Sequence, residues 1–212
     1  MIRPEGLRGA AFGTLAEGDG RSDDTARRAF SRVLGISEEW ACVSQVHGVD
    51  IVEADGPGEW GEADGIVTSV ERLPLAIGTA DCVPVVLEGS NVAALVHAGW
   101  RGTAAGVIEA VLSALSAKGT PPTRAAIGPA IGACCYEVGP EVAQEFTGYI
   151  ATTRWGTTSV DLVGAIAARL SPLPVWLSGR CTYTSNDLNS FRRDKTSRRQ
   201  VALAWLPTIS SA

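Results

Sequence analysis

The chain has 212 residues, of which 45% are hydrophobic and 19% charged, the balance of a folded globular protein rather than a disordered or fibrous one. Its formal net charge of −5 argues against a nucleic-acid partner, and no apolar stretch reaches the ~20 residues that a membrane helix needs. The amino terminus lacks the apolar core of a signal peptide, and five cysteines without an export signal are typical of reduced thiols. We expect a cytoplasmic protein with one domain over residues 1–212 that binds neither nucleic acid nor membrane.

The first half of the chain predicts one helix followed by short strands. A helix is expected near residues 23–34, because Ser22-Asp23-Asp24 is typical of a helix cap and apolar residues follow at helical spacing. Short apolar runs separated by glycine then predict a series of strands. These runs are Ala41–Val46, Asp50–Glu53, Gly65–Ser69, Pro74–Thr79, Val83–Leu87 and Val92–His97.

The second half predicts more helix. A helix over Thr103–Lys118 is indicated by its alanine and leucine content and by the Gly119 that follows it. The remaining predicted elements are a strand at Arg124–Ile127, helices at Pro140–Thr147 and Val160–Leu170, and strands at Val175–Leu177 and Val201–Trp205. Regular strand–helix alternation is missing between residues 41 and 97, and no G-x-G-x-x-G follows a strand, which argues against a Rossmann-type domain. We expect an α+β fold in which mixed β-sheets are flanked by helices, a layered α/β sandwich.

Three residues are candidate metal ligands. The chain has only two histidines, His47 and His97, and both lie beside glycine turns, as does Cys82 in an equivalent position between them. Imidazole and thiolate bind zinc well, and three protein ligands leave one coordination position free. Their wide separation does not fit a zinc finger, and a lone buried histidine or cysteine is more often structural. From the residues alone, both interpretations stay open.

Longer motifs occur along the chain in the order found in one family. They are Ser44-Gln45-Val46-His47-Gly48, Ala63-Asp64-Gly65-Ile66-Val67-Thr68, Ala80-Asp81-Cys82-Val83-Pro84-Val85, Val96-His97-Ala98-Gly99-Trp100-Arg101-Gly102-Thr103, and Ile127-Gly128-Pro129 with Cys135-Tyr136-Glu137-Val138-Gly139. The chain resembles, over almost its whole length, the laccase-domain (YfiH-type) proteins, also called multicopper polyphenol oxidase domain proteins or purine nucleoside phosphorylases. The resemblance implies that His47, Cys82 and His97 bind zinc, or copper in some accounts.

The same resemblance implies phosphorolysis of purine nucleosides (adenosine, inosine and methylthioadenosine) and deamination of adenosine. Phosphorolysis requires a bound phosphate, for which Arg101 is the candidate, although it could instead pair with a carboxylate. Deamination requires a proton shuttle, for which Asp81 is the candidate, although it could instead orient a turn or a histidine. The substrate partners are therefore a purine nucleoside and phosphate.

Other residues near these motifs have two interpretations each. Gln45 could hydrogen-bond the substrate or satisfy a strand end, and Trp100 could stack on a purine or pack under a loop. The vicinal Cys134-Cys135 pair is not expected to form a disulfide, and we interpret Cys135-Tyr136-Glu137 as a structural stretch at the pocket rim. A short cationic run, Arg192-Arg193-Asp194-Lys195 with Arg198-Arg199, is large enough for a phosphate but too small for a duplex.

Three alternative functions were weighed. Copper-dependent phenol oxidation relies on several copper ions, and the two histidines of the chain are too few to ligate such a cluster. A metal-free hydrolase would use Cys82 as the nucleophile and His97 as the base; the family resemblance implies peptidoglycan precursor editing as the role of such an enzyme. A protein that holds zinc only for structure would need a fourth ligand, which the sequence does not offer. No feature of the sequence indicates an oligomeric state.

Overall fold

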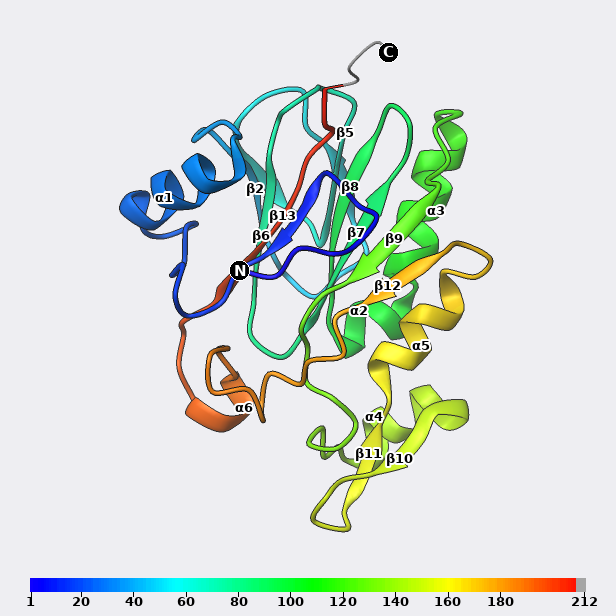
Figure 1. Cartoon of the computed structure of the whole chain (residues 1–212). Helices are drawn as coiled ribbons and strands as arrows, with labels where there is room; N and C mark the ends of the chain where they lie inside the picture. Colours follow the sequence, from blue (N-terminus) through cyan, green and yellow to red (C-terminus); the bar gives the residue numbers. More distant parts are fainter. Residues whose placement is uncertain (209–212) are drawn as a thin grey trace.

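Two β-sheets packed face to face form the centre of the protein, and helices cover both outer faces (Figure 1). The structure is a computed structural model that describes residues 1–208; residues 209–212 of the predicted domain lie outside the described residues. The arrangement confirms the predicted layered α/β sandwich with mixed sheets.

The strands pair in both directions within each sheet. The five-stranded sheet consists, in spatial order, of β1 (Ala10–Phe12), β13 (Gln200–Ala204), β6 (Leu75–Thr79), β2 (Ala41–Ser44) and β4 (Gly58–Glu62). The six-stranded sheet consists of β12 (Val175–Leu177), β9 (Arg124–Ile127), β7 (Val83–Glu88), β8 (Ala93–Ala98), β5 (Gly65–Thr68) and β3 (Ile51–Glu53). In the first sheet β2 is parallel to β6 and to β4; in the second β12 is parallel to β9, and β7 is antiparallel to β8. Every predicted strand is present, with ends that differ by at most two residues.

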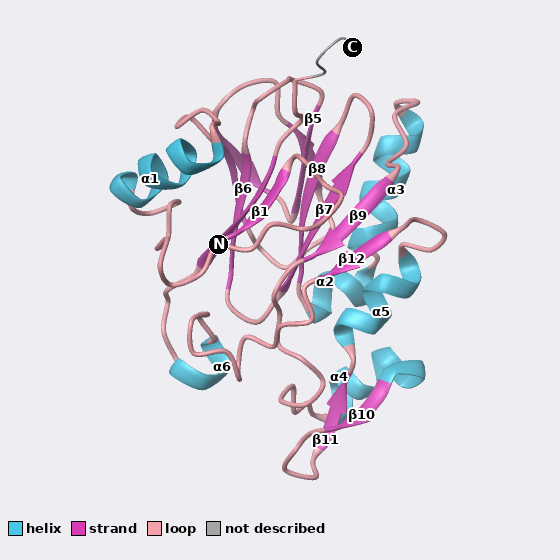
Figure 2. Ribbon diagram, viewed as in Figure 1, coloured by secondary structure: helices cyan, strands magenta, loops and turns pink. Residues whose placement is uncertain are grey.

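Apolar side chains fill three layers of core. Between the sheets, Leu75 and Ile77 of β6 pack in one cluster with Val86 of β7 and Leu95 of β8. On the outer face of the six-stranded sheet, the helices α3 (Val107–Ala117) and α5 (Leu162–Arg169) contribute buried side chains to the largest cluster (Figure 2). Burial of this apolar surface is the main force that holds the layers together.

The first helix matches its prediction. Helix α1 (Asp24–Leu34) packs on the outer face of the five-stranded sheet through Phe30. The carboxylate of Asp23 accepts hydrogen bonds from the backbone N–H groups of Thr25 and Ala26, which confirms the predicted cap.

The predicted single helix over Thr103–Lys118 is wrong. The chain forms two helices there, α2 (Trp100–Ala105) and α3, which are separated by Gly106 with φ of 98°. A left-handed residue interrupts the helical hydrogen bonds, and glycine adopts it without strain. Helix α2 also begins three residues earlier than predicted, directly after the Gly99 turn.

The later helices are shorter than predicted. The predicted helix at Pro140–Thr147 is α4 (Pro140–Ala143) followed by a 3-10 helix, and that at Val160–Leu170 begins only after Asp161, the N-cap of α5. The sequence missed β1 and β4, the hairpin of β10 (Ile150–Thr152) and β11 (Thr158–Val160), and helix α6 (Phe191–Asp194). Within residues 1–208, no helix combines the length and apolar character needed to span a membrane.

Candidate active site

The three predicted ligands meet at one end of the sandwich. Because β2 and β6 are parallel, their carboxyl ends lie at the same edge of the five-stranded sheet. His47 follows β2 and Cys82 follows β6, each in a segment that crosses to the six-stranded sheet. His97 is the penultimate residue of β8, and pairing of Val83 with Ala98 brings Cys82 beside it.

The donor atoms of these side chains are close enough to share an ion. One nitrogen from each histidine and the Cys82 Sγ all lie within 4.8 Å of one another. The Cys82 Sγ is 3.8 Å from His47 Nε2, and the two imidazole centroids are 4.8 Å apart. A Cβ atom on Gly99 would lie 2.9 Å from the His47 ring and 3.3 Å from the Cys82 Sγ, so the glycine leaves room for these side chains. Two imidazoles and one thiolate form a donor set that suits zinc.

A fully buried carboxylate, Asp64, organises this group. Its side chain accepts hydrogen bonds from the backbone N–H groups of Val46 (3.2 Å), His47 (3.0 Å) and Gly48 (2.5 Å). It also accepts one from His97 Nδ1 at 2.7 Å, which leaves Nε2 of that ring as the free nitrogen. This carboxylate–histidine pair fixes the tautomer and orientation of the imidazole, as in known metal sites. Asp64 also holds the His47 turn, in which His47 itself has φ of 62°.

The charges of the group depend on one another. Burial opposes ionisation of Cys82, but hydrogen bonds with His47 and His97 outweigh it and lower the pKa of the thiol to about 6. Burial likewise opposes protonation of His97, whereas Asp64 and Cys82 raise its pKa to about 9. The pKa of Asp64 is lowered, because its hydrogen bonds from His97 and the backbone outweigh its burial. Cys82 is therefore held as a thiolate, the form that binds metals.

The group opens into a cavity of about 590 Å³, within the range of about 300–1,000 Å³ typical of small-molecule sites. Arg21, Arg101, Arg192 and Arg199 line it together with the aromatic residues Trp100, Tyr136 and Phe191. The predicted cationic run thus contributes Arg192 and Arg199 to the same cavity as the three candidate ligands. Sequence reasoning assigned no role to Asp64, Arg21 or Phe191, which all belong to this site.

Arg101 and Trp100 lie at the start of α2, directly beyond the Gly99 turn. Arg101 is exposed, and its guanidinium carbon lies 4.4 Å from the centroid of the Trp100 ring. Among the described residues, Arg101 makes no ion pair with a carboxylate, so its charge is available to an anion in the cavity.

Asp81 connects the cavity to the carboxy-terminal segments. One carboxylate oxygen accepts a hydrogen bond from Thr182 Oγ1 at 2.6 Å, and the other accepts one from the Arg192 N–H at 2.7 Å. Its backbone oxygen accepts from the Ile131 N–H at 2.9 Å. Asp81 therefore holds the start of α6, and with it Arg192, at the cavity.

The side chain of Gln45 makes hydrogen bonds within the protein. Its amide exchanges two hydrogen bonds of 2.9 Å with the backbone of Gly78 on β6, and its Oε1 also accepts one from Arg21 at 2.7 Å. Gln45 thus satisfies a strand end and holds Arg21 at the wall of the cavity, which Gln45 also lines. A hydrogen bond from Gln45 to the substrate stays a prediction.

Comparison with known proteins shows the family of the chain. Residues 3–207 match the family described as multi-copper polyphenol oxidoreductase laccase. A Streptomyces griseus protein named purine nucleoside phosphorylase ORF3 is 38% identical over 95% of this chain and 90% of the relative. A Deinococcus radiodurans protein named purine nucleoside phosphorylase is 40% identical over 89% of this chain and 81% of the relative.

Two solved structures share the fold. YlmD from Geobacillus stearothermophilus superposes with a TM-score of 0.83 at 28% identity, covering 94% of this chain and 92% of that one. The Bacillus licheniformis hypothetical protein YfiH gives a TM-score of 0.83 at 25% identity, covering 93% and 92%. As its motifs indicated, the chain belongs to the multi-copper polyphenol oxidoreductase laccase family of YfiH-type proteins.

Proposed function

We propose that this chain is a zinc-dependent purine nucleoside phosphorylase that acts on adenosine, inosine and methylthioadenosine, with adenosine deamination as a second activity. The observation that carries the proposal is the cavity itself, whose lining combines a His-Cys-His group with arginines and aromatic rings. The names of the Streptomyces and Deinococcus relatives support the same activity.

The arginines supply the phosphate site. Phosphorolysis joins a phosphate oxygen to C1′ of the ribose and breaks the C1′–N9 bond, whose electron pair leaves with the purine as it takes up a proton. Arg101 on α2 and Arg192 on α6 both line the cavity. Guanidinium groups bind phosphate oxygens through paired hydrogen bonds, so we assign phosphate binding to Arg101, with Arg192 and Arg199 beside it.

The aromatic rings supply the purine site. Phe191 is half exposed, and Trp100 and Tyr136 are partly buried on the cavity wall. Flat apolar rings stack on a purine base and exclude water from the glycosidic bond. The pKa of Tyr136 is raised to about 12 by burial and by nearby Cys82, so its hydroxyl stays protonated and can donate a hydrogen bond to a base nitrogen.

The metal group and Asp81 complete the site. When bound, zinc would act as a Lewis acid. His47, Cys82 and His97 are the residues that would hold it. Asp64 keeps the His97 imidazole oriented toward that position. For phosphorolysis we assign Asp81 a positioning role, because both of its carboxylate oxygens already accept hydrogen bonds; proton transfer in deamination would require it to release one of them.

One geometric feature supports a second candidate function, a metal-free hydrolase that edits peptidoglycan precursors. The Cys82 Sγ lies 3.8 Å from His47 Nε2, and its pKa is lowered to about 6, as expected of a nucleophilic thiolate with an adjacent histidine. In this case His47, rather than the predicted His97, is the exposed histidine beside the thiol.

Product analysis separates these functions. Protein purified without added metal is assayed for bound zinc and copper and then incubated with adenosine, with and without phosphate. Phosphate-dependent adenine and ribose 1-phosphate support the phosphorylase, and inosine formed without phosphate supports deamination. Cys82→Ala should abolish both, whereas Cys42→Ala, at a buried thiol in another core cluster, should not. Metal-free protein that cleaves a peptidoglycan precursor and loses this activity in Cys82→Ala would refute the phosphorylase.

The phosphate assignment has its own matched pair. Arg101→Gln should raise KM for phosphate about tenfold with a smaller change in KM for adenosine, since a charge-assisted contact contributes about 1.5–3 kcal/mol. Arg198→Gln removes an exposed arginine that does not line the cavity and should leave both constants unchanged. Equal effects of Arg101→Gln on both substrates would contradict the assignment.

A further inference from the structure

Three other cysteines converge outside the cavity just described. Cys134 and Cys135 lie in the loop that follows β9, and Cys181 lies in the segment that follows β12. Their Sγ atoms are all within 4.8 Å of one another, and those of Cys134 and Cys135 are 3.5 Å apart. No step of the proposed phosphorolysis uses them.

Parallel pairing of β9 with β12 explains the convergence. Both strands leave the sheet at the same end, and their pairing continues as an isolated bridge between Ala130 and Cys181. The Thr182 N–H donates to the Ala130 oxygen at 2.9 Å, and the Gly132 N–H donates to the Cys181 Sγ at 3.2 Å. The two segments are thus joined by backbone hydrogen bonds, which fix Cys181 against the Cys134 loop.

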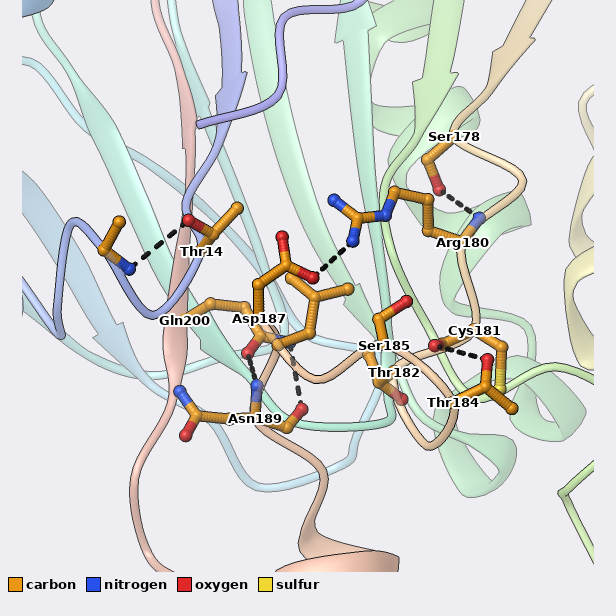
Figure 3. Close-up of polar contacts among 12 residues, drawn as sticks. Thr14, Ser178, Arg180, Cys181, Thr182, Thr184, Ser185, Asp187, Asn189 and Gln200 are labelled. Carbon is orange, nitrogen blue, oxygen red and sulfur yellow. Dashed lines mark hydrogen bonds and ion pairs between the residues drawn. The ribbon is translucent and has the colours of Figure 1, made fainter.

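The loop that carries Cys181 is also held internally (Figure 3). Thr184 Oγ1 donates to the Cys181 backbone oxygen at 3.3 Å, and the guanidinium of the preceding Arg180 pairs with Asp187. On the opposite side, the Arg154 N–H donates to the Cys134 oxygen at 2.9 Å. The three thiols are therefore arranged before any ligand arrives, which lowers the entropic cost of binding one.

Access and volume suit a small ion. A separate cavity of about 230 Å³ is lined by Cys134 and Cys181, together with Gly132 and Arg180. Cys134 is exposed and Cys181 partly exposed, whereas Cys135 is buried. An ion can therefore reach Cys134 and Cys181 from solvent, and Cys135 offers a third thiol on the buried side of the site.

The electrostatics require a cation if all three thiols are to ionise. Burial and the neighbouring thiols raise the pKa of Cys135 to about 12, and burial also raises that of Cys134. Burial opposes ionisation of Cys181 too, but N–H groups of Gly132, Thr184 and Tyr183 lower its pKa. One thiolate is thus favoured, and two more would repel it unless a cation compensates their charge.

The spacing matches such a cation. Tetrahedral zinc with Zn–S bonds of about 2.3 Å separates its sulfur ligands by about 3.8 Å. Here the Sγ atoms of Cys134 and Cys135 are 3.5 Å apart, and Cys181 Sγ lies within 4.8 Å of both. A disulfide would use only two of the thiols. We propose that Cys134, Cys135 and Cys181 form a second metal site, an all-thiolate site for one soft cation of the zinc or cuprous copper type.

Cadmium titration tests the proposal, because cadmium–thiolate bonds absorb in the ultraviolet and the signal does not depend on activity. The full chain carrying Cys82→Ala, which disables the first site, should bind one cadmium ion with this absorption. Adding Cys181→Ser or, at the exposed position, Cys134→Ser should weaken that binding at least about tenfold. Adding Cys42→Ser removes a cysteine outside the cluster and should leave the affinity unchanged.

Two results would overturn the proposal. One is thiolate absorption that persists at the same affinity in both Cys181→Ser and Cys134→Ser, each checked for a native fold by circular dichroism. The other is a disulfide that joins Cys181 to Cys134 or Cys135 in protein purified without reductant, identified by mass spectrometry of its peptides, since the cluster would then be a redox pair.

Discussion

The molecule contains two groups of candidate metal ligands that are equally compact but differ in how their charge is balanced. In each, the donor atoms lie within 4.8 Å of one another at strand ends. At the first, two imidazoles, one of them hydrogen-bonded to the buried Asp64, adjoin one thiol and, against its burial, lower the pKa of Cys82 to about 6. At the second, thiols face other thiols, and the pKa of Cys135 rises to about 12. Metal binding displaces protons at both groups, because a ligating imidazole is neutral and a ligating thiol is ionised. The first group releases the proton of His97, whose pKa is raised to about 9, whereas the second releases thiol protons.

The surroundings of the two groups differ as well. The His-Cys-His group opens into the cavity of about 590 Å³ with several arginines and aromatic rings, and the three-cysteine group opens into one of about 230 Å³. A nucleoside with phosphate suits only the larger cavity, so we expect catalysis at the first group alone. The predictions below test this division.

Loss of a ligand at the first group should have the largest effect. His97→Ala removes one of the three donors and leaves Asp64 buried without its imidazole partner. The kcat for phosphorolysis should fall more than about 100-fold. Substituting a residue that only hydrogen-bonds a metal ligand already lowers metal affinity or activity about 10–100-fold, and His97 is itself a proposed ligand. Steady-state kinetics with metal analysis of the same sample provides the measurement. Retained metal together with unchanged kcat would show that the group is not the catalytic centre.

Asp64→Asn should have the next largest effect, through the orientation of His97. An amide keeps the size of the side chain but carries no charge, and it has one acceptor oxygen for the four N–H groups that Asp64 now accepts from. Zinc affinity should fall 10–100-fold, as for other supporting residues of metal sites. Competition with a chelator measures the affinity. Because Asp64 also raises the pKa of His97, the variant should show a lower imidazole pKa by NMR in metal-free protein, which a purely structural role would not require.

Thiol reactivity should separate the two groups by pH. A lowered pKa means that the Cys82 thiolate persists as pH falls until about 6, so its alkylation by iodoacetamide in metal-free protein should slow about tenfold between pH 7 and pH 5. Cys134 has a raised pKa, so its alkylation should still be accelerating above pH 9. Mass spectrometry of the labelled peptides distinguishes the sites. If the two cysteines share one profile, the electrostatic contrast between the groups is wrong.

The sequence predicted the first group and not the second for a physical reason. His47, Cys82 and His97 each lie beside a turn within a recognisable motif, so local pattern and family resemblance were sufficient. Asp64 lies in such a motif too, but its role depends on the His47 turn folding back over it.

The second group depends on contacts between distant segments. The hydrogen bond between Gly132 and Cys181 joins positions 49 residues apart, and it follows from the parallel pairing of β9 with β12, which no local pattern encodes. Strand β4 was missed for another reason, because its sequence Gly-Glu-Trp-Gly-Glu shows no alternation of apolar residues and it lies exposed at the sheet edge. The break between α2 and α3 at Gly106 was missed because a glycine within a helical pattern does not by itself indicate a left-handed conformation.

The smallest effects should come from one methyl group added beside each cluster. In Gly99→Ala the new Cβ would lie 2.9 Å from the His47 ring, closer than real contacts allow, so the exposed imidazole must shift and zinc affinity should fall several-fold. In Gly132→Ala the nearest atoms, the Cys134 Sγ and the Cys181 Cβ, lie 3.4 Å away, an ordinary contact that keeps the N–H donor to Cys181. Cadmium affinity at the three-cysteine group should therefore stay within about twofold. Titrating both variants with both metals gives a matched comparison, because each mutation adds the same group at a similar place. If Gly132→Ala proved the more disruptive, the three thiols would be packed more tightly than a site open to an entering ion can be.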